Sequence, residues 1–325
     1  MNLASSTRKT MRPADPAAHL DLPDRAVIDA AYRRIVATAP EPAPAIALPR
    51  TYRRRLALGL AAAGVAGVVT AVVVIPSSGG TAYAATPPPL RYQLPSPGTA
   101  DAAAELNRLA RIAAARPAPR GDVAHIHLRQ WALSTSVDGA GGTDTVTSKV
   151  ITEDIDWFKR PSGVTVTRRL LDGKSRPESG SDPATAFEDR QVPSTPEALR
   201  TWLGADQPGV GIGDAAGMND AVVDLMISHV LTPRQQSALL RTIATTPGLR
   251  YRGTVRDRAG RDGEAFTAES AANGLPTRFT FIVDPATGSL LGQESMLTKT
   301  AGSLNVRIPS VIAYQVYLTS ERRSE

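Results

Sequence analysis

Two histidines separated by one residue are the side chains of this sequence best suited to chemistry. His125 and His127 lie in residues 123–134, where apolar and polar residues alternate. The alternation predicts a β-strand with both imidazoles on one face. Such a pair is compatible with zinc ligation. The sequence identifies no third ligand, so we expect an exposed or groove-lining histidine pair and predict no metal site.

Three further groups of residues invite a chemical interpretation, and each is better explained structurally. His229 falls on the apolar face of a predicted helix and is expected to be a core or rim histidine. The glycine-rich run 209–213 lacks the GxGxxG spacing and the following Lys-Ser/Thr of a phosphate-binding loop, which predicts a flexible loop. Glu153, Asp154 and Asp156 are expected to be solvated charges of a turn.

The residue types that are missing exclude several kinds of catalysis. The sequence contains no cysteine, which excludes thiol chemistry, cysteine-ligated metals and disulfides. It also contains neither G-x-S-x-G nor H-E-x-x-H. We therefore predict that the protein is not an enzyme and binds no cofactor, with an unrecognised hydrolase as the minor alternative.

The basic character of the chain is concentrated at its N-terminal end. The whole sequence carries a formal net charge of +6. Residues 1–55 contain ten Lys/Arg and five Asp/Glu, which leaves 27 basic and 26 acidic residues for the remainder. Because the larger part of the chain is nearly neutral, we predict no nucleic-acid partner.

An uncharged run predicts one membrane-spanning helix. Residues 56–75 read LALGLAAAGVAGVVTAVVVI, with Thr70 as the one polar side chain. At 1.5 Å per residue, 20 residues extend about 30 Å, which is the thickness of the hydrocarbon core. The run PSSGG at 76–80 ends the predicted helix.

Charges around the predicted span indicate its orientation and its partners. Arg50 and residues 53–55 precede it, and no charge follows until Arg91. Basic residues stay in the cytoplasm, so we predict a cytoplasmic N-terminus and a C-terminal domain outside the cell membrane. Small residues recur every fourth position at 59, 63, 67 and 71, a spacing that permits a weak helix-mediated dimer.

A cleaved signal is the alternative to a retained anchor. The tripeptide Ala82-Tyr83-Ala84 has the A-x-A form of a signal-peptidase site, and Arg54-Arg55 resembles a twin-arginine signal. The 55 residues before the apolar run are long for a signal peptide, and the run itself has spanning length. We therefore predict a retained anchor, while cleavage after Ala84 stays open.

The segments on either side of the predicted span are expected to be extended or disordered. Residues 1–55 form a basic cytoplasmic tail, largely disordered, with a short helix near 24–37 that contacts a cytoplasmic partner or anionic lipid. Residues 76–100 are Pro-rich and predict an extracytoplasmic stalk. Residues 101–325 form the predicted extracytoplasmic domain.

The pattern of this outer domain predicts an α+β fold. Helices are expected at 101–115, after Thr195-Pro196, and on both sides of Thr232-Pro233, where Gln235 completes a capping box. Strands are expected near residues 123–134, 145–151, 156–159, 164–171, 249–256, 265–269, 279–283, 290–298 and 308–318. Consecutive hairpins with segregated helices predict a curved antiparallel meander, half-barrel-like, covered by helices.

Several short motifs resemble those of a known family. They are YAATPPPL at 83–90, Gln130-Trp131, Pro247-Gly248, DRAGR at 257–261 and VDPATG at 283–288. These motifs resemble an actinobacterial family of single-pass membrane proteins without assigned activity, commonly encoded beside an extracytoplasmic-function sigma factor. The resemblance spans residues 50–300 and implies no catalytic residues. The last meander is also similar to the half-barrel of lipoprotein carriers and sigma-factor regulators.

Two functions are consistent with these features. The first is a membrane-anchored extracytoplasmic binding or sensing module, linked to sigma-factor signalling, whose partner is a protein. The second is a lipid or lipoprotein carrier that holds an acyl chain in a cavity of the curved sheet. In a carrier, Phe279, Phe281 and Met226 are the residues expected to line the groove.

Overall fold

The computed structural model describes residues 83–94, 101–138, 145–161, 165–171, 174–175, 190–205, 210–302 and 304–324. The predicted tail, the predicted span with its stripe of small residues, and residues 76–82 and 95–100 of the predicted stalk lie outside the described residues. Within the described ranges, no helix is both long enough and apolar enough to cross a membrane.

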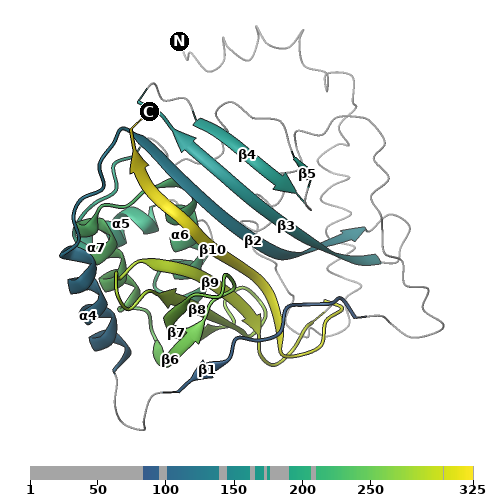
Figure 1. Ribbon diagram of the computed structural model, residues 1–325. Helices are drawn as coiled ribbons and strands as arrows, with labels where there is room; N and C mark the ends of the chain where they lie inside the picture. The colour runs from purple at the N-terminus through teal and green to yellow at the C-terminus, as the bar shows by residue number, and fades with distance from the viewer. Residues whose placement is uncertain are drawn as a thin grey trace, which may run out of the picture. The chain divides into compact units, whose positions relative to one another are not determined.

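One antiparallel sheet and four helices make up the described part of the chain (Figure 1). The strand order is β1-β6-β7-β8-β9-β10-β2-β3-β4-β5. The first and last strands of this order do not pair, so the sheet is open, and the predicted α+β class with an antiparallel sheet is confirmed. The strands are β1 Tyr92–Gln93, β2 Val123–Asp138, β3 Thr145–Lys159, β4 Thr165–Leu171, β5 Lys174–Ser175, β6 Arg250–Arg256, β7 Asp262–Ser270, β8 Thr277–Val283, β9 Leu290–Leu297 and β10 Ser310–Arg323.

Two meanders join through the last strand of the chain. Strands β6 to β10 follow one another in sequence and in space, and so do β2 to β5. Strand β10 then pairs with β2, which brings the C-terminal residues beside the first long strand of the domain. Three of the helices lie between the two meanders in sequence. The helices are α4 Ala102–Ala114, α5 Pro196–Gly204, α6 Ala215–Ser228 and α7 Pro233–Ile243.

The helices begin where side chains satisfy their free N–H groups. Asp101 accepts a hydrogen bond from the Ala103 amide, and Thr195 caps α5 directly before a proline. Thr232 and Gln235 form the predicted capping box at the start of α7. These three helix starts are confirmed.

The helices cover one face of the sheet, here called the inner face. They pack on alternate residues of the strands, such as Ile126 and Leu128 of β2 and Phe281 of β8. The intervening residues point to the opposite, outer face. The helix residues of this core include Leu106 and Leu109 of α4, Leu199 and Leu203 of α5, Met218 and Leu225 of α6, and Leu239 and Ile243 of α7.

The prediction of two separate strands over residues 145–159 is wrong. They form one continuous strand, β3, that pairs with β2 from Ala124 opposite Lys159 to Asp138 opposite Thr145. The interruption was predicted from a concentration of acidic residues at 153–156. Those carboxylates lie on a strand whose partner supplies matching basic and polar groups, so no turn is needed to solvate them.

Residues 83–94, assigned from sequence to the stalk, lie against the sheet and are here called the strap. The Ala84 amide donates a 2.8 Å hydrogen bond to the Asn305 carbonyl. At its other end the strap forms β1, which pairs with β6 at the sheet edge. Leu90 and Tyr92 pack on an outer-face cluster of Val255, Ala265, Ile282 and Leu291. The folded domain therefore includes residues well before position 101.

Candidate functional site

The predicted histidine pair lies on the outer face of β2, between β10 and β3. His125 makes contacts to both neighbouring strands. Its Nε2 lies 2.9 Å from Asp156 Oδ1, and its Nδ1 lies 3.2 Å from Glu321 Oε1. His127 Nε2 lies 2.6 Å from Asp154 Oδ1, whose second oxygen accepts from Arg129 at 3.3 Å. The strand pairing therefore supplies each imidazole with a carboxylate partner.

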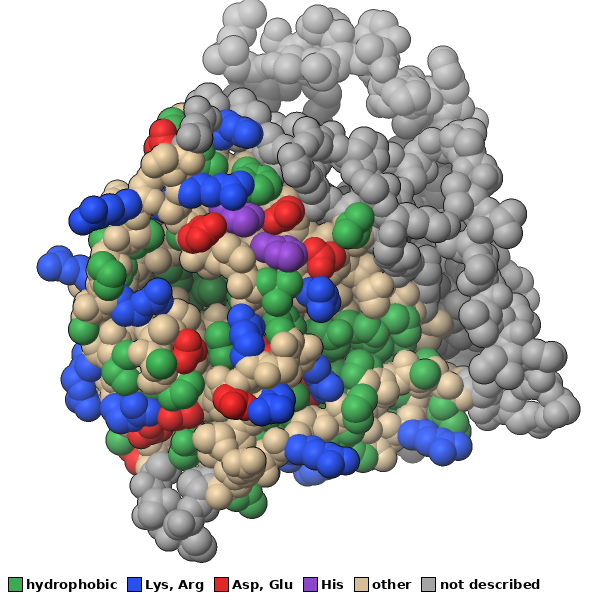
Figure 2. Space-filling model, viewed as in Figure 1, with side chains coloured by type: hydrophobic (Ala, Val, Ile, Leu, Met, Phe, Trp, Pro, Cys, Tyr) green, Lys and Arg blue, Asp and Glu red, His purple; other side chains and the backbone are tan. Residues whose placement is uncertain are grey.

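Aromatic contacts complete this group at the end of β3. The imidazole of His125 stacks on Phe158, with ring centroids 4.5 Å apart and planes parallel to within 1°. The guanidinium of Arg323 lies 4.6 Å from the centroid of the Phe158 ring. Figure 2 shows histidines flanked by acidic and basic side chains on the face that it presents. These side chains form the outer-face array: His125, His127, Arg129, Asp154, Asp156, Phe158, Glu321 and Arg323.

The array joins its histidines to carboxylates and does not assemble a metal site. Among the described residues, no group of three or more His, Cys, Asp or Glu side chains could hold a metal ion. The nitrogens that would bind zinc instead face carboxylates of the neighbouring strands.

The prediction that Glu153, Asp154 and Asp156 are turn charges is wrong. All three belong to β3. Asp154 and Asp156 point to the outer face, whereas Glu153 lies on the inner face and accepts a hydrogen bond from Gln130. The alternation of acidic and apolar side chains within residues 153–158 could have indicated a strand. The pairing with β2 is set by a long hairpin, and sequence spacing alone does not reveal it.

The residues expected to line an acyl-chain groove are buried in the core. Phe281 is 0% exposed and Met226 is 3% exposed, and both belong to the cluster formed by the helices and the inner face. Phe279 is 4% exposed and packs in a smaller cluster with Ala215, Ala216 and Ala268. Phe279 and Phe281 share one face of β8, and α6 covers that face.

The described part of the glycine-rich run packs against α6, and His229 lies at the C-terminal end of the same helix. The carbonyls of Val210 and Gly211 lie against α6, where a Cβ at Gly217 would be 2.3 Å from the Gly211 oxygen. Residues 206–209 lie outside the described residues. His229 caps the C-terminus of α6, and its ring makes an edge contact with Trp202 at 5.7 Å between centroids.

A carboxylate cluster that the sequence did not predict lies where α4 meets β7. Arg108 donates to Glu264 at 2.8 Å and also to Glu105. The Glu264 side chain is buried, and its Oε2 has no hydrogen-bond partner among the described residues. Burial raises the pKa of Glu264 to about 6, against the attraction of Arg108. Tyr251 lies close by, and burial raises its pKa as well.

A second buried ion pair lies on the outer side of the sheet, under the strap. Arg258 Nε donates to Glu294 at 2.8 Å, and its Nη2 donates to the Pro88 carbonyl at 2.8 Å. Burial raises the pKa of Glu294, although Arg258 opposes this shift. The Arg258 side chain thus fixes the middle of the strap to β9.

Comparisons with known protein families, curated proteins and solved structures find no match to this chain.

Proposed function

We propose that the chain is a membrane-anchored extracytoplasmic binding or sensing module that acts through the outer face of its sheet. The filled inner face is the observation that carries this proposal. Leu225, Leu239 and Phe281 are fully buried there by packing between helices and strands. A small-molecule site requires a concave, accessible cavity, whereas a filled inner face leaves the outer surface for recognition.

The outer-face array is suited to a protein partner. Its charged groups are held in place by cross-strand contacts such as His127 to Asp154 and His125 to Asp156. Both signs of charge are present in the array, and charged groups of this kind set specificity at protein–protein interfaces. Because these groups are already ordered, a partner loses little side-chain entropy in binding them.

The anchor and the signalling link complete the proposal. Residues 56–75 are the proposed transmembrane helix, with the tail 1–55 in the cytoplasm and the described domain outside. The family resemblance supports a link to sigma-factor signalling, in which the cytoplasmic tail reports the occupancy of the outer domain. We also propose that the sheet of the outer domain is curved like a half-barrel.

Site-specific photo-crosslinking in the native host tests the proposed interface. A photoreactive residue is placed at Glu321 in the array and, as the matched control, at the exposed Glu197 of α5. We expect an adduct of one defined mass at position 321, absent at 197, and lost when Arg129→Glu reverses a charge of the array. Equal adducts at the two positions, or an adduct that is insensitive to Arg129→Glu, would contradict the proposal.

A further inference from the structure

We propose that the strap is a membrane-docking surface, which lays the domain against the anionic headgroups of the bilayer that anchors it. This inference rests on the proposed transmembrane anchor. It concerns a surface separate from the outer-face array and commits to a lipid bilayer as the partner.

Exposed apolar side chains are concentrated on the strap. Among the described residues, the large exposed hydrophobic side chains are Tyr83 at 51%, Leu94 at 66% and Leu170 at 43%. Two of the three lie at the two ends of one 12-residue segment. Tyrosine prefers the membrane–water interface, where its ring is apolar and its hydroxyl is hydrated. Leucine adds apolar area that a headgroup layer can cover.

Two exposed arginines, one in the strap and one beside its first residue, are suited to phosphates. Within the described residues, Arg91 is exposed and forms no ion pair, and the exposed Arg307 lies over the Tyr83 ring at 5.0 Å. The strap itself contains no acidic residue. Arginine binds phosphate oxygens through a planar set of donors. The surface therefore combines positive charge with exposed apolar groups, as interfacial membrane segments do.

The inward and outward sides of the strap are clearly divided. Leu90 and Tyr92 pack on the domain, and the Tyr92 hydroxyl lies 3.2 Å from Thr280 Oγ1. The side chains of Arg91 and Leu94 are exposed. Near Tyr83, an open pocket of about 490 Å³ is lined by prolines 87–89, Arg307 and Pro309. Because the inward side is fixed to the domain, the outward side is presented as a rigid surface.

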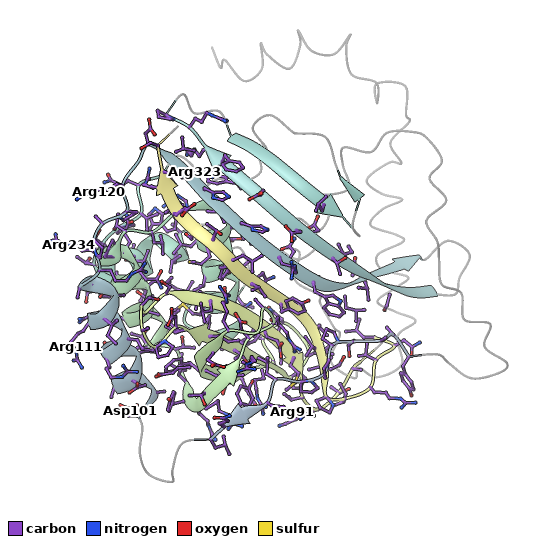
Figure 3. All side chains as sticks on the ribbon, viewed as in Figure 1. Arg91, Asp101, Arg111, Arg120, Arg234 and Arg323 are labelled. Carbon is purple, nitrogen blue, oxygen red and sulfur yellow. The ribbon has the colours of Figure 1, made fainter. Side chains whose placement is uncertain are left out.

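The length of the tether favours the bilayer over other partners. Because the strap belongs to the folded domain, only residues 76–82 separate it from the predicted span. Seven residues reach at most about 25 Å. A short tether holds the strap at high effective concentration near the headgroups, so weak contacts suffice for docking. Figure 3 shows Arg91 beside β1 and Arg234 on the helical side of the domain, and the latter provides a control position.

The absence of native cysteine allows a direct test with full-length protein in nanodiscs that contain phosphatidylglycerol. An environment-sensitive fluorophore is attached at Leu94→Cys and, in a second sample, at Glu197→Cys. We expect lipids carrying a quencher in their headgroup region to quench the label at position 94 several-fold more than the label at 197. Because one basic side chain near an anionic surface contributes about 1 kcal/mol, Arg91→Glu should shift the docking equilibrium toward the free form by about fivefold or more. Arg234→Glu should not change it.

Three outcomes would overturn the inference, and they separate it from the failure of the anchor. Equal quenching at positions 94 and 197 in a protein that resists alkaline extraction removes the docking surface and leaves the anchor standing. Equal sensitivity to Arg91→Glu and Arg234→Glu also removes it. If alkali extracts the protein, or if its intact mass lacks residues 1–84, the anchor fails and the docking surface fails with it.

Discussion

At the scale of single residues, the histidine pair is occupied by carboxylates of its own sheet. We expect His125→Gln combined with His127→Gln to leave the fold intact, because glutamine retains hydrogen-bonding groups and partly exposed ion pairs contribute about 1 kcal/mol or less each. The wild-type protein should retain no stoichiometric zinc after dialysis. Thermal unfolding of both proteins measures the stability of the fold, and elemental mass spectrometry measures the bound zinc. One equivalent of zinc in the wild type, lost in the double variant, would restore the metal interpretation.

Glu264 gives the protein a pH-dependent stability with a definite sign. Its pKa in the folded state is about 6, above its ordinary value of 4.5, so folding favours the protonated form. The corresponding stability is fully present below pH 4.5 and is lost as the pH rises through 6. The loss is at most about 2 kcal/mol, at 1.36 kcal/mol per pKa unit.

The variant Glu264→Gln should lack this step, because its amide does not ionise. Denaturant unfolding at about pH 4 and about pH 7 gives the free energy of unfolding of both proteins. The difference in this free energy between variant and wild type should change by up to about 2 kcal/mol from one pH to the other. Glu269→Gln, at the exposed end of the same strand, is the control. Parallel stability profiles for wild type and Glu264→Gln would show that Glu264 is not protonated by folding.

At the scale of elements, the start of α6 depends on close backbone contact. A Cβ at Gly217 would lie 2.3 Å from the Gly211 carbonyl oxygen, whereas a Cβ at Gly211 would meet nothing within 4 Å. We expect Gly217→Ala to destabilise the fold by roughly 1–3 kcal/mol, although alanine is the better helix former. Gly211→Ala should change stability by about 0.5 kcal/mol or less. Chemical denaturation measures the stability of both variants. Equal losses of stability would contradict this account of the glycine-rich run.

Local signals were sufficient to predict the helix starts and an antiparallel sheet, but not the strand pairing that joins the two meanders. The caps at Asp101, Thr195 and Thr232 are determined by residues within one turn, and all three helices begin where the sequence indicates. The pairing of β10 with β2 joins residues nearly 200 positions apart, and no local pattern encodes it. This pairing brings Glu321 to His125. The two histidines were therefore identified in sequence, but their contacts with Asp154, Asp156 and Glu321 were not.

The strap shows a second limit of local patterns. Its prolines predicted an extended stalk, and within the described residues 83–94 the structure assigns no regular element except β1. An extended segment can nevertheless pack along a sheet when alternate residues are apolar, as Leu90 and Tyr92 are. Composition could not distinguish a free stalk from one that packs on the sheet, because the difference depends on the apolar cluster that the sheet presents to Leu90 and Tyr92.

At the scale of the whole molecule, the filled inner face distinguishes a closed module from a carrier. An acyl chain gains about 0.8 kcal/mol per buried methylene, but it must first displace helices packed on residues such as Phe281 and Leu239. We therefore expect the outer domain to be free of lipid. To test this, the folded full-length protein is purified from membranes, and a protease site introduced into residues 76–82 releases the domain for native mass spectrometry. The released mass should match the polypeptide alone. An acyl lipid present at near one-to-one occupancy would instead show that the helices open, and the lipid-carrier function would replace the binding module.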